Sequence, residues 1–211
     1  IFNDVKKVAT KIKRTNIVLC PPSIYLSFFA DKTKSPLFLG AQNTNSESFG
    51  SLTGEVSVSQ IAHLGLDYVI VGHSERRKMG EIDEDVNKKV KAVVNYGMNA
   101  IFCIGETTRD NNGDYLNFIK HQILLSLKYI PKKFAGNIVV AYEPVWAIGA
   151  KEAQTPRDLH EMSIFIKKVL NDLFGDFAGG IPIIYGGAVD RVNADNLVRE
   201  GNVSGLLIGR Q

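Results

Sequence analysis

Residues 138–149 read IVVAYEPVWAIG, and this stretch decides the fold. The first five residues are apolar, with no alternation of polar side chains, which is typical of a strand buried on both faces of a parallel sheet. Glu143 and Pro144 follow at once, so the predicted strand ends at Tyr142 with a carboxylate at its carboxyl end. Such a strand needs neighbours on both sides, and the rest of the chain supplies them.

Short apolar runs alternate with helical patterns from one end of the sequence to the other. Six further runs read as strands: Ile17–Cys20, Leu37–Gly40, Tyr68–Gly72, Ala100–Ile104, Ile183–Tyr185 and Gly205–Ile208. Between them, apolar residues recur at helical spacing, as in helices laid against a sheet. The four stripes are Phe2, Val5, Val8 and Ile12; Val86, Val90 and Val93; Leu116, Ile119, Ile123 and Leu127; and Leu159, Met162, Ile166, Val169 and Leu173.

This alternation is compatible with an open doubly wound sheet or with a closed (β/α)8 barrel. An open sheet usually has a glycine-rich turn after its first strand, whereas here Pro21 and Pro22 follow Cys20. No linker or charge run divides the chain, so we predict that residues 1–211 form a single α/β domain, a TIM (β/α)8 barrel. The first strand and last helix of that barrel are not visible, because the sequence opens on a predicted helix, Phe2–Arg14, and closes on a predicted strand.

Composition excludes several classes of function. The 211 residues are 45% hydrophobic and 22% charged, which is ordinary for a soluble globular protein. No apolar run approaches the ~20 residues that span a bilayer, so we predict no membrane association. A net charge of +3 is too small to indicate a nucleic-acid partner, although it suits a small anionic substrate. Cys20 and Cys103 lie in predicted strands, which favours buried thiols and a cytoplasmic location.

Two chemically useful side chains follow predicted strands. In TIM barrels the active site lies at the carboxyl ends of the strands, where this sequence places His73 and Glu143. Pro144 and Trp146 should shield Glu143 from water and raise its pKa towards that of a useful base. Ser74 is a candidate helix cap, and a helix amino terminus disfavours positive charge, so we expect a neutral His73 that donates a hydrogen bond.

Glycine-rich turns follow the last two predicted strands. Gly186, Gly187 and Gly209 would let backbone amides approach an anion closely, at the usual phosphate site of this fold. Taken singly, each of these residues has an ordinary structural explanation: a surface carboxylate, a rim histidine, a tight turn. Their convergence on one rim predicts an active site.

Two segments resemble the signature sequences of the triosephosphate isomerase family. Residues 68–77, YVIVGHSERR, resemble the segment around its catalytic histidine, and residues 141–149, AYEPVWAIG, resemble the segment that carries its catalytic glutamate and lid. Shorter matches occur in family order across nearly the whole chain, at Cys20–Pro22, Gly40–Asn43, Thr53–Glu55, Cys103–Thr107 and Tyr185–Gly187.

The resemblance implies a glycolytic and gluconeogenic enzyme that interconverts dihydroxyacetone phosphate and D-glyceraldehyde 3-phosphate without a metal or organic cofactor. Glu143 would abstract a proton beside the carbonyl and return it at the neighbouring carbon, and neutral His73 would polarise the carbonyl and stabilise the enediolate, the division of labour already known for this family. Ser74 and Glu75 would support the pair.

The resemblance also assigns binding residues and a partner. The lid that closes over the substrate would comprise Pro144, Val145, Trp146, Ala147 and Ile148. Backbone amides at Gly149, Ala188, Gly209 and Arg210 would hold the phosphate. The segment 42–55 resembles the family's dimer loop, so Thr53 would reach the active site of the partner in a homodimer.

Three departures from the family pattern keep alternatives open. The family's Asn-x-Lys pair, which helps to hold the anionic substrate, lies outside this sequence. After Gly149 the lid reads Ala150-Lys151-Glu152-Ala153 in place of Gly-Thr-Gly-Lys, and Ala188 and Arg210 replace a usual Ser and Gly. One alternative is a non-catalytic or weakly active barrel that acts only with a missing segment or subunit. Another is a phosphate-binding aldolase or synthase, although no predicted strand carries the lysine that a Schiff base needs.

Overall fold

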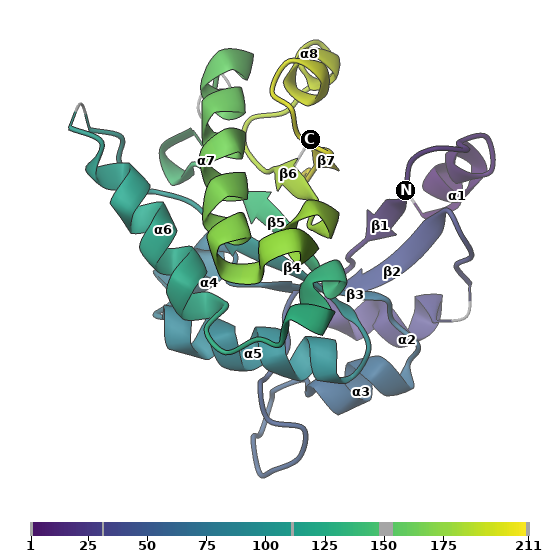
Figure 1. Cartoon of the computed structure of the whole chain (residues 1–211). Coiled ribbons are helices and arrows are strands. Elements are labelled where there is room, and N and C mark those ends of the chain that lie inside the picture. Colours follow the sequence, from purple (N-terminus) through teal and green to yellow (C-terminus); the bar gives the residue numbers. More distant parts are fainter. Residues whose placement is uncertain (1, 31, 111, 148–153, 210–211) are drawn as a thin grey trace. The chain divides into compact units, whose positions relative to one another are not determined.

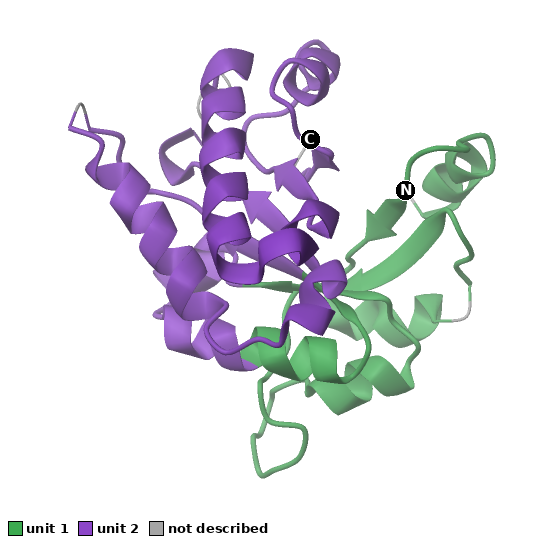
Figure 2. Ribbon diagram, viewed as in Figure 1, with its two compact units in different colours: residues 1–71, 89–100 green, residues 72–88, 101–211 purple. Residues whose placement is uncertain are grey.

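The computed structural model describes residues 2–30, 32–110, 112–147 and 154–209. Along the chain, helices and strands alternate as in Figure 1. The chain divides into two compact units, residues 1–71 with 89–100 and residues 72–88 with 101–211 (Figure 2). Two elements contribute residues to both units, namely α5 (Asp83–Asn95) and β4 (Asn99–Ile104).

In the first unit, parallel strands alternate with short helices. Its remaining elements are α1 (Phe2–Ala9), β1 (Ile17–Leu19), η1 (Ser23–Tyr25), α2 (Leu26–Phe29), β2 (Leu37–Ala41), α3 (Val58–His63) and β3 (Tyr68–Val71). Strand β2 is paired in parallel with β1 and β3. Gly40 is needed there, because a Cβ atom on it would lie 2.7 Å from the Cys20 sulfur. Burial raises the pKa of the Cys20 thiol to about 12.

The second unit carries the longer helices. Its remaining elements are α4 (Ser74–Lys78), α6 (Asp114–Ser126), η2 (Lys132–Asn137), β5 (Ile138–Tyr142), η3 (Val145–Ala147), α7 (Pro156–Phe174), η4 (Gly175–Gly180), β6 (Ile183–Tyr185), α8 (Ala194–Arg199) and β7 (Gly205–Leu206). Strand β6 is paired in parallel with β5 and β7. Because these strands run in the same direction, their carboxyl ends lie at one edge of the sheet.

The sequence of α7 explains where this helix begins and which of its faces is buried. The Thr155 side chain accepts a hydrogen bond from the Asp158 backbone N–H and so caps the helix, and Pro156 occupies the first turn, where a missing N–H costs nothing. The predicted apolar stripe is buried from Leu159 to Val169. The stripes of α5 and α6 are likewise buried at Val86, Val90, Val93, Ile119, Ile123 and Leu127.

Strands β1 and β3 each end one residue before the predicted bound, and two further predicted elements are shorter by more than one residue. Helix α1 ends at Ala9 rather than Arg14, and Lys11 and Ile12 continue it only through turns that hydrogen bond three residues back. Val8 is 52% exposed while Ala9 is buried, so the predicted stripe was wrong at this point. Strand β7 stops at Leu206, and Ile208 is 55% exposed. In both places an apolar side chain extended the predicted pattern beyond the last regular backbone hydrogen bonds.

Candidate active site

Close backbone contacts position Glu143 in the second unit. It follows β5 directly and is only 3% exposed. Its N–H donates to the carbonyl of Ile104 at 2.7 Å, which holds the end of β5 against the end of β4. Gly105 comes next on the β4 side, and a Cβ atom there would overlap the Glu143 carbonyl oxygen. Glycine at this position therefore allows the two strand ends to approach each other.

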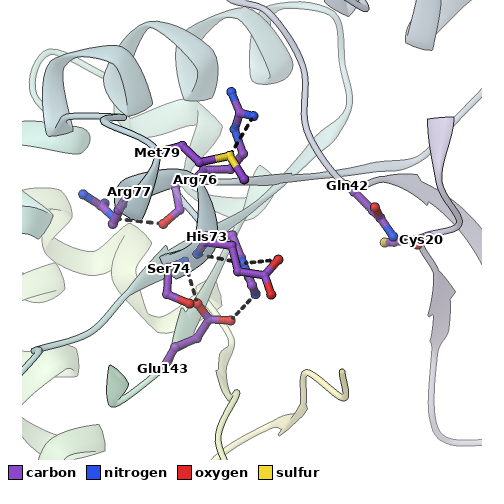
Figure 3. Close-up of polar contacts among 10 residues, drawn as sticks. Cys20, Gln42, His73, Ser74, Arg76, Arg77, Met79 and Glu143 are labelled. Carbon is purple, nitrogen blue, oxygen red and sulfur yellow. Dashed lines mark hydrogen bonds and ion pairs between the residues drawn. The ribbon is translucent and has the colours of Figure 1, made fainter. Parts of the chain in front are cut away.

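The Glu143 carboxylate meets the start of α4 (Figure 3). Its Oε1 lies 3.1 Å from Nε2 of His73, and its Oε2 accepts a hydrogen bond from the Ser74 backbone N–H at 3.3 Å. Both contacts lie within one compact unit. The structure thus brings together the two side chains that the sequence assigns to the chemistry.

His73, rather than the predicted Ser74, is the amino-terminal cap of α4. Its Nδ1 accepts a hydrogen bond from the Glu75 backbone N–H at 3.3 Å, and Ser74 is the first helical residue. An accepting Nδ1 carries no proton, so the imidazole in this arrangement is the neutral tautomer with its proton on Nε2. That proton is donated to Glu143. The structure therefore shows that Nε2 faces the Glu143 carboxylate and that the Glu75 backbone N–H holds Nδ1.

The pKa of His73 is raised from its ordinary value, mainly because Nε2 hydrogen bonds to the Glu143 carboxylate. Burial acts in the opposite direction, and the Glu143 and Glu75 charges add to the increase. The sequence predicted a neutral imidazole from the helix terminus alone and did not place a carboxylate 3.1 Å away. The hydrogen bond into Nδ1 favours the neutral form, whereas the carboxylate favours the cation.

Replacing Glu143 by Gln should lower the pKa of His73, because the anion is lost while burial and the hydrogen bond to Nδ1 remain. The folded pKa exceeds the ordinary 6.5, so the pair stabilises the fold most below pH 6.5 and loses this contribution as pH rises through the folded pKa. An NMR titration of the His73 imidazole resonances in the wild type and in Glu143→Gln measures the shift. An unchanged His73 pKa would contradict the assignment.

The buried carboxylate of Glu106 holds the residues on both sides of Glu143. Its Oε1 accepts hydrogen bonds from the Tyr142 hydroxyl at 2.9 Å and the Trp146 indole N–H at 2.8 Å. Its backbone carbonyl accepts from the Val145 N–H at 2.9 Å. Burial, and then the Glu106 charge, raise the pKa of Tyr142. Sequence reasoning noted Glu106 only as part of a strand-end motif and missed this role.

The whole chain, residues 1–211, matches the family model described as triosephosphate isomerase. The chain belongs to the triosephosphate isomerase family. Its relatives include the triosephosphate isomerase of Natranaerobius thermophilus, 40% identical over 194 residues that cover 91% of this chain and 76% of that protein. The triosephosphate isomerase of Idiomarina loihiensis is 36% identical to this chain, with 97% of this chain and 82% of that protein covered. That of Rhodopirellula baltica is 41% identical, with 94% of this chain and 80% of that protein covered. The family fold is a TIM barrel, which confirms the predicted fold class.

The other residues that the triosephosphate isomerase signature singles out are placed less uniformly. Pro144 and Ala147 are buried, Val145 is half-buried, and Trp146 is 40% exposed.

The Glu75 carboxylate lies 3.9 Å from His73 Nδ1 and its side chain is 73% exposed, so its closer contact with the site is the backbone N–H. Ala188 is half-buried, with its carbonyl accepting from the Asn193 amide, and Gly209 is exposed. Ile148, Gly149 and Arg210 lie outside the described residues, and Thr53 is an exposed residue of the first unit.

A metal site and a membrane-spanning helix are both absent from the described parts of the chain. There, no group of three or more His, Cys, Asp or Glu side chains could hold a metal ion. In the same residues, no helix is long and apolar enough to cross a membrane.

Gly186 shapes the space for the Glu143 side chain. A Cβ atom on Gly186 would lie 2.9 Å from Cγ and 3.2 Å from Oε1 of Glu143. Such a contact forces the carboxylate to move, because 2.9 Å is well inside the normal carbon–carbon separation. Sequence reasoning had noticed this glycine only as a possible phosphate contact.

Gly186→Ala should therefore lower kcat by roughly 10- to 100-fold, since an error of about 1 Å in the position of a reacting group costs on the order of 10²-fold. Steady-state kinetics measure the effect. Gly179→Ala is the matched control, because a Cβ atom there meets nothing within 4 Å. Equal kcat values for the two variants would show that Gly186 does not constrain the Glu143 carboxylate.

Proposed function

We propose that this chain interconverts dihydroxyacetone phosphate and D-glyceraldehyde 3-phosphate, with Glu143 as the base and His73 as the polarising acid. The observation that carries the proposal is the 3.1 Å contact between His73 Nε2 and Glu143 Oε1, in which the carboxylate belongs to a residue only 3% exposed. A base and a hydrogen-bond donor in contact can face adjacent atoms of one small substrate. Membership of the triosephosphate isomerase family supplies the reaction.

The proposed steps follow from these two groups. Glu143 leaves His73 and takes a proton from the carbon beside the substrate carbonyl. The electrons of the broken C–H bond form the carbon–carbon double bond of an enediolate, and the π electrons of the carbonyl move onto its oxygen. The Nε2–H of His73 donates to the oxygen that gains negative charge, while Nδ1 stays bound to the Glu75 N–H. Glu143 then returns the proton to the neighbouring carbon. The hydroxyl proton of the first carbon passes by way of His73 Nε2 to the charged oxygen, so that the new carbonyl and the new hydroxyl form together. Because Glu143 is buried, little water must be displaced before the first transfer.

Substrate binding is assigned to backbone amides at the same edge of the sheet. We propose that Gly149, Ala188, Gly209 and Arg210 hold the phosphate. Support comes from Ala188 and Gly209, which follow the paired parallel strands β6 and β7 and so lie at the carboxyl edge that also carries Glu143. Residues 144–148 would form the lid that shields the enediolate from water.

A coupled assay tests the reaction. Purified protein is given dihydroxyacetone phosphate, and glyceraldehyde 3-phosphate is followed through its oxidation by an excess of a dehydrogenase. The expected result is turnover that depends on the amount of protein and is lost in Glu143→Gln. A correctly folded protein with no turnover above the buffer rate would overturn the proposal and favour the non-catalytic alternative.

A homodimer is the second part of the proposal. The segment 42–55 of the first unit carries Phe49, which is 83% exposed, and Leu52, which is 43% exposed. Backbone pairing of Asn45 with Val56 and the capping box of Ser57 and Gln60 close this loop. Large apolar side chains exposed on an ordered loop are typical of an interface. Light scattering should give twice the chain mass, and Phe49→Ser should weaken the dimer; a monomeric wild type would exclude it.

Two further assignments rest on the family and the sequence. We propose that the whole chain forms one TIM-barrel domain, as the match over residues 1–211 supports. We also propose a cytoplasmic location, supported by two cysteines that lie in or beside strands, where reduced thiols are expected.

A further inference from the structure

Buried polar groups other than His73 and Glu143 gather around the Glu106 carboxylate in the second unit. Two donors, the Tyr142 hydroxyl and the Trp146 indole, both reach Oε1. Among the described residues, the other oxygen, Oε2, is buried and has no hydrogen-bond partner. Buried carboxylate oxygens are normally hydrogen bonded, so this one needs an explanation.

Gln154 presents a complementary group to the same cluster. It is 3% exposed and immediately precedes Thr155, the cap of α7. Its backbone N–H donates to the Tyr185 hydroxyl at 3.3 Å. Its amide faces the Tyr142 hydroxyl as a hydrogen-bond donor, which acts to lower the pKa of Tyr142 against the larger effect of burial. Within the described chain, neither the nitrogen nor the oxygen of its amide has a hydrogen bond of good geometry.

A buried amide without partners is unfavourable for stability. An apolar side chain of the same size would avoid the desolvation penalty, so the stability of this arrangement does not explain a glutamine at position 154. A donor without an acceptor and an acceptor without a donor lie around one tyrosine hydroxyl. A side-chain rotation that brings the Gln154 nitrogen to Oε2 of Glu106 would satisfy both.

We propose that Gln154 is a positioning residue for the isomerisation, and that its amide nitrogen donates to Oε2 of Glu106 when substrate is bound. Glu106 bonds to Tyr142, Val145 and Trp146, which flank Glu143 in the chain. The Gln154 amide then fixes Glu106, and with it the segment that carries the base, while the Glu143 carboxylate leaves His73 for the substrate. This inference rests on the proposed function.

The test compares two substitutions that remove the amide. Gln154→Met keeps most of the volume, whereas Gln154→Ala leaves a cavity. We expect kcat to fall on the order of tenfold in both variants, as for a slightly misplaced base, with KM changing much less. The melting temperature should stay the same or rise in Gln154→Met and fall in Gln154→Ala. Trp146 is the only tryptophan, so its fluorescence reports the cluster directly, and its response to the unreactive analogue sn-glycerol 3-phosphate should shrink in both variants.

The outcomes separate this inference from the proposed function. An inactive wild type would remove the function itself. If the wild type is active and Gln154→Met keeps both its kcat and its fluorescence response, the amide has no positioning role. Loss of activity in Gln154→Ala alone would show that the side chain acts only by filling space. Should Gln154→Met not fold, Gln154→Leu replaces it in the same comparison.

Discussion

Replacing Glu143 by Gln is expected to lower kcat by about 10³-fold while leaving the protein folded. General base catalysis contributes about 10²–10⁴-fold, and an amide cannot take a proton from carbon. Glutamine has the shape of glutamate, and its oxygen can still accept the His73 Nε2–H that now reaches Oε1 at 3.1 Å. Steady-state kinetics with the triose phosphate substrate measure the loss, and circular dichroism with thermal melting checks the fold.

Glu161→Gln is the matched control for that experiment. It makes the same chemical change on α7, where the Glu161 side chain is 62% exposed and pairs with Arg157 four residues earlier. Pairs of this kind contribute about 0.3–0.5 kcal/mol, so neither kcat nor stability should change appreciably. Retention of wild-type kcat by Glu143→Gln would exclude Glu143 as the base, whatever the control does.

Gly105→Ala is expected to destabilise the protein by about 3 kcal/mol or more, at the upper end of the cost of overpacking a core. The added Cβ atom would overlap the Glu143 carbonyl oxygen, which is backbone and cannot rotate away. The end of β4 must then move from β5 and strain the hydrogen bond from Glu143 N–H to Ile104. Activity should fall as well, because the displaced backbone carries Glu143, the proposed base. Urea unfolding measures the free energy of unfolding.

Gly136→Ala provides the comparison for Gly105→Ala. A Cβ atom on Gly136 meets nothing within 4 Å, so this substitution should be neutral or stabilise by up to about 1 kcal/mol through the unfolded state. A Gly105→Ala protein as stable as Gly136→Ala would mean that the strand ends are not in close contact.

The sequence predicted the strands well because buried parallel strands are short apolar runs with sharp polar ends. Strands β5 and β6 have the predicted bounds, Ile138–Tyr142 and Ile183–Tyr185. The same signal located His73 and Glu143, since both follow such runs directly. Where an apolar residue continued the pattern beyond the regular structure, as at Ile12 and Ile208, the predicted elements were too long.

Contacts between segments distant in sequence could not be predicted in the same way. A Gly105-Glu106 pair at the end of a strand does not indicate by itself that the glycine lies against the Glu143 backbone. Nor does it indicate that the Glu106 carboxylate accepts a hydrogen bond from Trp146. These facts depend on the separation of two strand ends, which is a property of the packed sheet. The pKa of His73 was missed for the same reason, because its main cause is a side chain 70 residues away.

Because an imidazole caps α4, an enzyme of this kind can lose its activity by mutation in a particular way. Asparagine, serine and aspartate are the usual residues at the start of a helix, and histidine reaches Asn or Asp by a single nucleotide change. A gene copy released from selection for turnover could therefore exchange His73 while keeping the helix start. The protein encoded by that gene copy would still fold and would still be recognisable as a relative, but it would no longer catalyse the proton transfer.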